Sequence, residues 1–212
     1  SSALFHGLIR LSYAKQAHHP LMIAQALAYF ELVSKKNEIS AIYRDEDDCI
    51  ILHNKLVKTL EEQDFKFNSK SSMEKFDELL QNEAVLNNVS YLRKPEKSFI
   101  LDFILSNYQT SRDFYVLHLI TSFEALLEFE EYLYDFDDVL NHFFLLAQIF
   151  VLFNRTSSTE QNIDVNNVQE LHKKVLELND FHDIKLFYSL LKLDRIFENE
   201  KINWVASYLF KK

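Results

Sequence analysis

The chain has 212 residues and a formal net charge of −9, with one glycine, two prolines and one cysteine. Average proteins carry about 7% glycine, so glycine-rich structures are excluded, including dinucleotide-binding fingerprints and P-loops. A single cysteine, Cys49, excludes an internal disulfide and a multi-cysteine metal site, and it fits a reducing, cytoplasmic location. The negative charge argues against binding of nucleic acid or anionic membranes.

The shortage of glycine also argues against an all-β fold, because tight hairpins favour glycine-containing turns. We therefore predict an all-α fold of about eight or nine helices, built as a multi-helix bundle or an array of helical hairpins in one domain over residues 1–212. The longest apolar run, 143–153, is about half a membrane span. We interpret it as a buried helix and expect no membrane span.

Apolar residues at helical spacing predict the elements of the first half. Pro20 separates two helices that we expect to form a hairpin, because proline suits the first turn of a helix. Pro95 marks a second break. The predicted helices are 3–17, 20–35, 49–62, a helix that starts at Ser72, and 97–107.

The second half is predicted to contain longer helices. The most apolar helix, 136–153, is expected at the centre of the fold. Asp180 is expected to cap the helix that begins at residue 181. The Ser- and Asn-rich stretch 157–167 is expected to be an exposed loop. The predicted helices are 111–131, 136–153, 168–178, 181–197 and 202–210.

The first candidate cluster lies on the first helix, where His6, Arg10 and Tyr13 are spaced to share one face. Gly7, the only glycine, stands in mid-helix, where it costs about 1 kcal/mol relative to alanine. We infer that another helix or a ligand approaches the backbone there. The alternative is close helix packing beside a solvated arginine.

The second cluster is His118, Thr121 and Ser122, a polar group in an apolar helix. It could line a ligand site. The alternative is a core histidine whose ring N–H bonds a backbone carbonyl, next to a threonine that bonds its own helix.

The third cluster is His182 and Lys185, three residues apart on one helix face. The imidazole could act as a base or hydrogen-bond acceptor. The ammonium could bind an anionic oxygen or a phosphate of a reduced nicotinamide. The alternative is an exposed helix start.

Together the three clusters resemble the questin oxidase-like family. Residues 5–14 (FHGLIRLSYA) and 26–29 (ALAY) are similar to its FHGxIRxxYA … LAY segment. Residues 117–126 (LHLITSFEAL) are similar to its HxxTxxxAL helix, and 180–186 (DFHDIKL) to its DxHxIKL helix. Family members carry a His-rich segment upstream of the first motif, so we expect this chain to correspond to the C-terminal part of such a protein.

The resemblance implies an all-helical oxidoreductase. Characterised members open an anthraquinone ring by Baeyer–Villiger-type oxygen insertion that depends on reduced nicotinamide, so a small aromatic molecule and NADPH are the implied ligands. By analogy the catalytic residues would be His6, Arg10, His118, His182 and Lys185. The substrate-binding residues would be Gly7, Tyr13, Thr121 and Ser122.

Two other functions fit the sequence. One is a non-catalytic helical protein-interaction module, and the other is a metal-binding helical protein in which three imidazoles hold the ion. The positions of His6, His118 and His182 discriminate among these, because a ligand site requires them to converge on a pocket between their three helices. The sequence predicts no oligomeric state.

Overall fold

The computed structural model describes residues 3–33, 39–153 and 163–211, and it confirms the all-α prediction. These residues contain eleven α-helices, somewhat more than expected, and two short strands. The elements of the first half are α1 (Ala3–Gln16), α2 (Pro20–Val33), β1 (Ile42–Arg44), α3 (Glu46–Glu62), α4 (Ser72–Leu80), α5 (Glu83–Asn88) and β2 (Ser90–Leu92).

The second half contains the longer helices and three short 3-10 helices. Its α-helices are α6 (Lys97–Ser111), α7 (Phe114–Leu127), α8 (Phe136–Phe150), α9 (Val168–Leu171), α10 (Phe181–Asp194) and α11 (Glu200–Leu209). Its 3-10 helices are η1 (Glu130–Tyr132), η2 (Val151–Phe153) and η3 (His172–Glu177).

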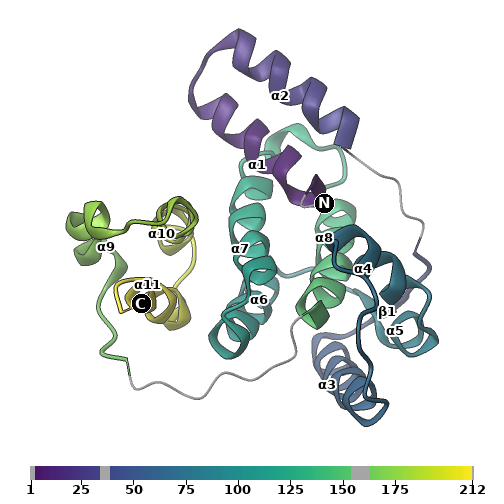
Figure 1. Cartoon of the computed structure of the whole chain (residues 1–212). Helices are drawn as coiled ribbons and strands as arrows, with labels where there is room; N and C mark the ends of the chain where they lie inside the picture. The colour runs from purple at the N-terminus through teal and green to yellow at the C-terminus, as the bar shows by residue number, and fades with distance from the viewer. Residues whose placement is uncertain (1–2, 34–38, 154–162, 212) are drawn as a thin grey trace.

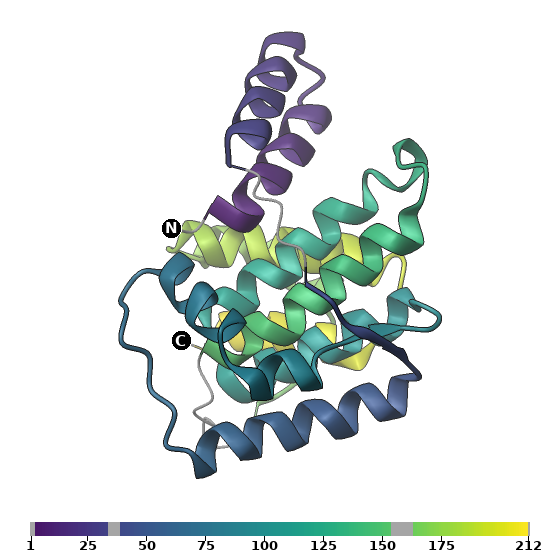
Figure 2. The same cartoon turned by 90° about the vertical axis from the view of Figure 1, so that its right-hand side faces the viewer.

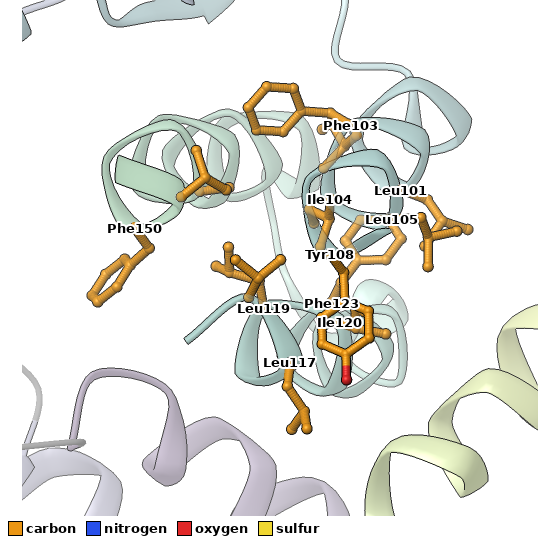
Figure 3. Packing of buried hydrophobic residues seen from close by; sticks show 14 of the residues in the cluster. Leu101, Phe103, Ile104, Leu105, Tyr108, Leu117, Leu119, Ile120, Phe123 and Phe150 are labelled. Carbon is orange, nitrogen blue, oxygen red and sulfur yellow. The ribbon is translucent and has the colours of Figure 1, made fainter. Parts of the chain in front are cut away.

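The α6–α7 pair forms the middle of the molecule (Figure 1). On one side α10 packs against α7 and α11 packs against α6, and on the other side α8 contacts both middle helices. Helices α3, α4 and α5 lie beyond α8 on that same side. Figure 3 shows part of the buried apolar cluster, with side chains that come from α6, α7 and α8.

The first two helices form the predicted hairpin and project from the body of the molecule (Figure 2). Within the described residues α2 packs mainly on α1, whereas α1 also packs on α7. Several large apolar side chains of α2 are exposed as a result: Leu21, Met22, Leu27, Phe30 and Leu32.

The predicted helix 111–131 is wrong at both ends. Ser111 belongs to α6, and the following Arg112 adopts the left-handed conformation, with φ 51°, that ends that helix. Asp113 then starts α7, because its Oδ1 accepts hydrogen bonds from the backbone N–H groups of Tyr115 (2.7 Å) and Val116 (3.3 Å). The two helices are thus separated by a two-residue corner, which lets α6 and α7 pack against each other.

Two boundaries at the C-terminal end also differ from the predictions. The segment 168–178 is divided into the short α9 and the 3-10 helix η3, and α10 ends at Asp194 instead of 197. The expected loop 157–167 lies partly outside the described residues, and its described part, 163–167, contains neither helix nor strand.

Helix α8 is buried, as predicted, but it lies beside the α6–α7 pair instead of at the centre of the fold. The stretch Phe136–Phe153, which joins α8 to η2, is long and apolar enough to cross a membrane, but 67% of it is buried inside the fold. Phe144, Ile149 and Leu152 are completely buried. The structure therefore uses this stretch as a core helix.

The sequence analysis missed a parallel pair of three-residue strands, β1 and β2. Two side-chain amides of α8 hold β2 from the other side. Asn141 accepts from the Leu92 N–H (2.7 Å) and donates to the Leu92 carbonyl (3.1 Å). Gln148 makes the same pair of bonds with Ser90. The amides take the place of a third strand, because they satisfy backbone groups that would otherwise be buried without partners.

Candidate functional site

Three histidines from three helices come together where α7 packs against both α1 and α10. The ring centroids of His6 and His118 are 5.0 Å apart, and those of His118 and His182 are 5.6 Å apart. His118, on α7, therefore contacts both of the others. We call these residues the three-histidine cluster. They are distant in the sequence, so their meeting is produced by helix packing.

The hydrogen bonding of His118 defines which ring nitrogen carries the proton. Its Nδ1 lies 2.8 Å from the backbone carbonyl of Phe114, and a carbonyl can only accept, so Nδ1 donates. Burial, with smaller effects from the other two histidines and Lys185, lowers the pKa of His118 to about 4. At neutral pH the ring is therefore uncharged, and its Nε2 presents a lone pair.

Two cations lie beside the cluster. The pKa of His6 is lowered first by burial and then by the positive charges of Lys185 and Arg10. The Arg10 guanidinium lies 4.4 Å from the ring centroid of Tyr29 on α2, and the Lys185 ammonium lies 4.7 Å from that of Phe181. Both cations rest on aromatic faces, a favourable position for a positive charge.

Two phenylalanines that the sequence analysis gave no role flank His182. The ring centroid of Phe114 is 4.3 Å from that of His118 and 5.0 Å from that of His182, and Phe181 lies 3.8 Å from His182. Phe114 is 45% exposed and Phe181 is 57% exposed. The four-residue spacing of Phe114 and His118 could have revealed the first, because such residues share a helix face.

Asp180 caps α10 as predicted and fixes the start of the helix that carries His182. Its Oδ1 accepts hydrogen bonds from the backbone N–H groups of His182 (2.6 Å) and Asp183 (3.4 Å). The same oxygen lies 3.3 Å from the Nδ1 of His182, whose side chain is 25% exposed. His182 is thus held between a carboxylate and two aromatic rings, with one side open to solvent.

Three further predicted site residues, Thr121, Ser122 and Gly7, lie on the same helices as His118 and His6. Thr121 donates to the His118 carbonyl (3.1 Å), which is the helix-bonding alternative considered from the sequence. Ser122 is fully buried, and its hydroxyl has no hydrogen-bond partner in the described structure. Buried hydroxyls are nearly always bonded, so an unbonded one next to a histidine suits a ligand or a water molecule. Gly7 is buried in α1.

Tyr13 belongs to a second polar group further along the same three helices. Burial, the Glu124 carboxylate and Tyr188 raise its pKa to about 12. Glu124 accepts from Lys192 (2.8 Å) and from the Ser189 hydroxyl (3.3 Å). The sequence analysis did not identify this group, although a glutamate within the apolar helix 117–127 was a visible signal.

The two described pockets lie away from the histidines. One, of about 560 Å³, is lined by residues that include Arg93, Lys97 and Phe197, and the other, of about 380 Å³, by residues that include Arg44 and Glu46. Helix α7 packs against both α1 and α10, as the predicted site requires, and the histidine rings of the three helices contact one another. Among residues 3–33, 39–153 and 163–211, no group of three or more His, Cys, Asp or Glu is arranged to hold a metal ion.

Comparison with known proteins finds no matching family model, no matching curated protein and no matching solved structure. The resemblance to the questin oxidase-like family therefore stays a prediction that rests on the three sequence motifs.

Proposed function

We propose that the chain is an oxidoreductase of the questin oxidase type that binds a flat aromatic carbonyl compound at the three-histidine cluster. The observation that carries the proposal is the meeting of His6, His118 and His182 from three separate helices. Each of them belongs to one of the motifs that resemble the family. Titratable groups with shifted pKa values often gather at functional sites, and the pKa values of His6 and His118 are both lowered, which supports a ligand site.

The surroundings of the cluster suit a flat phenolic ligand. The exposed rings of Phe114 and Phe181 offer faces and edges for stacking. The Nε2 of His118 can accept a hydrogen bond from a phenol, because the pKa of His118 is near 4 and the ring stays neutral.

The proposed reaction inserts one oxygen atom of dioxygen between a carbonyl carbon and a neighbouring ring carbon, and the second oxygen atom leaves as water. A reduced nicotinamide, when bound, would supply the two electrons as a hydride, and one proton taken up from the solvent completes the water molecule. Arg10 and Lys185 suit the phosphates of that cofactor. The same cations can stabilise negative charge on the substrate's carbonyl oxygen. His182, which is partly open to solvent, is placed to exchange protons with the substrate.

The proposal is tested by thermal shift with a neutral hydroxyanthraquinone, NADPH and divalent metals, each with wild type and His118→Phe. A ligand at about 100 times its dissociation constant stabilises a protein by about 2.7 kcal/mol. We expect the quinone to stabilise wild type and to lose this effect in His118→Phe. With NADPH and dioxygen present, mass spectrometry should show a product heavier by one oxygen atom.

The control is His172→Phe, which removes an exposed histidine from η3. Its ligand response should equal that of wild type. If the quinone leaves the melting temperature of well-folded wild type unchanged, the proposed function is wrong. A shift produced only by a divalent metal would instead favour the metal-binding alternative.

A second candidate function is a helical protein-interaction module, and the exposed apolar side chains of α2 favour it. Leu21 is 60% exposed and Leu32 is 84% exposed, and several exposed apolar side chains on one helix favour an interaction site. The test is sedimentation of wild type and of Leu21→Glu/Leu32→Glu over a range of concentrations. Self-association that the double variant abolishes would support an interaction role, whereas a monomer in both cases would count against self-association through α2.

A further inference from the structure

Arg10 and Lys185 differ from the other basic residues near α1, α7 and α10 in their partners. Lys192 contacts two carboxylates, and Lys15 contacts Glu128. Within the described part of the chain, no carboxylate lies within 4.0 Å of the charged group of Arg10 or Lys185. The guanidinium of Arg10 lies over the ring of Tyr29, and the ammonium of Lys185 lies over the ring of Phe181.

The two cations lie near the cluster on different helices. Arg10 follows His6 by about one turn of α1, and Lys185 of α10 lies over the Phe181 ring that packs against His182. Both positive charges lower the pKa of His6, although burial has the larger effect. Asp180 contacts His182, and it is occupied as the cap of α10. The positive charge beside His6 is therefore not neutralised by these contacts.

We infer that Lys185 and Arg10, together with the three-histidine cluster, form a subsite that selects a ligand with an anionic oxygen group. In a chain of net charge −9, carboxylates are plentiful, yet none in residues 3–33, 39–153 and 163–211 forms an ion pair with Arg10 or Lys185. A lysine ammonium and an arginine guanidinium both donate charge-assisted hydrogen bonds to carboxylate or phosphate oxygens. The inference rests on the proposed function and adds the charge of the ligand to it.

The arrangement also indicates how such a ligand would lie. The Lys185 ammonium sits over the ring of Phe181, and Phe114 contacts two of the histidines. An aromatic body stacked against the phenylalanines would place an anionic substituent at the ammonium. The anionic oxygen can come from an aromatic acid or from a nicotinamide phosphate, and these two sources are separable by experiment.

The experiment compares two matched pairs of ligands by calorimetric titration. Anthraquinone-2-carboxylate is compared with neutral 2-hydroxymethylanthraquinone, and NADPH is compared with NADH, which lacks the additional phosphate. Each pair is measured with wild type, Lys185→Gln, Arg10→Gln and the control Lys58→Gln. Lys58 is an exposed lysine of α3, so its replacement makes the same change in net charge elsewhere.

We expect the anionic member of at least one pair to bind wild type about tenfold more tightly than its neutral or less charged partner. This preference should be lost in Lys185→Gln, reduced in Arg10→Gln, kept in Lys58→Gln and weakened by salt. Preference in the quinone pair identifies the substrate as the source, and preference in the nicotinamide pair identifies the cofactor.

Equal binding within both pairs would overturn the inference while leaving the proposed function standing, because the neutral quinone would still bind. A preference that survives in Lys185→Gln and Arg10→Gln would overturn it as well. If neither quinone binds and NADPH binds no better than NADH, both the inference and the proposed function fail. Circular dichroism of each variant checks that the helices are intact.

Discussion

Glu124 of α7 and Lys192 of α10 form a buried ion pair, with 2.8 Å between Oε1 and Nζ and side chains only 4% and 19% exposed. The ammonium also lies 2.7 Å from a carboxylate oxygen of Glu128. Burial raises the pKa of Glu124 even though Lys192 acts in the opposite direction. This pair joins two of the helices that carry the three-histidine cluster, so it helps to hold the cluster together.

Replacing one partner of this pair should strongly destabilise the protein. Lys192→Met leaves the buried Glu124 carboxylate without its main counter-charge, and we expect the free energy of unfolding to fall by about 3–5 kcal/mol. Chemical denaturation measures the change. The double variant Glu124→Gln/Lys192→Met should recover part of the loss, because it leaves no uncompensated buried charge.

The control for that prediction is Lys58→Met, which breaks an exposed pair with Glu62. Exposed pairs contribute about 0–1 kcal/mol, so the loss should be small. An equally small loss for Lys192→Met would show that the buried pair does not join α7 to α10 as described.

The protein should lose stability as the pH falls from about 6.5 to about 4. Burial lowers the pKa values of His53 and His118 from 6.5 to about 4. In this window the unfolded chain binds protons that the folded chain does not, so protonation favours unfolding. The contribution of each histidine is full above pH 6.5 and reaches up to about 3 kcal/mol.

The measurement is denaturant unfolding at several pH values for wild type, His53→Phe and His118→Phe. Each variant should show a weaker dependence on pH between 6.5 and 4. NMR titration of the His118 ring gives a direct check, and a midpoint close to 6.5 would contradict the expected burial effect.

Removing the cap of α7 should cost about 1 kcal/mol. Asp113 accepts two backbone hydrogen bonds at the corner between α6 and α7, and alanine cannot replace it. Thermal or chemical unfolding of Asp113→Ala measures the loss. Asp113→Asn keeps an oxygen at the same place and should be close to wild type; equal losses in both variants would indicate that the charge matters more than the cap.

The helices were predictable because apolar spacing marks them, but the corner at Arg112 was not. A left-handed residue that ends a helix is usually glycine, and this chain uses an arginine there instead. The strands were missed because they are three residues long and depend on Asn141 and Gln148, which follow them by 49 and 58 residues. In the sequence, Asn141 and Gln148 appear only as polar residues that interrupt the apolar pattern of α8.

At the candidate site, the sequence singled out all three histidines and both nearby cations. It could not show that the histidines contact one another, since that depends on how α1, α7 and α10 pack. The ion pair of Glu124 and Lys192 was not predicted for the same reason. Two charges that are distant in the sequence form a pair only when their helices face each other. The histidine rings contact one another at the place where the sequence predicted a pocket.

The amides of α8 should be essential to the fold around β2. Asn141→Leu removes two hydrogen bonds and leaves the N–H and carbonyl of Leu92 without these partners, so we expect a loss of about 2–4 kcal/mol. Denaturant unfolding measures it. Asn54→Leu, at an exposed asparagine of α3, is the matched control and should change stability by less than about 1 kcal/mol; similar effects at both positions would contradict the role given to Asn141.

The dependence of β2 on α8 also has a consequence for the order in which the chain folds. During synthesis β2 leaves the ribosome before α8 exists, so its inner backbone groups have no partner until dozens of further residues have been made. Closing such long loops slows folding. We therefore expect β1 and β2 to pair late in folding, although β1 is synthesised before β2. We also expect the backbone of β2 to complete its hydrogen bonds only after α8 has been made.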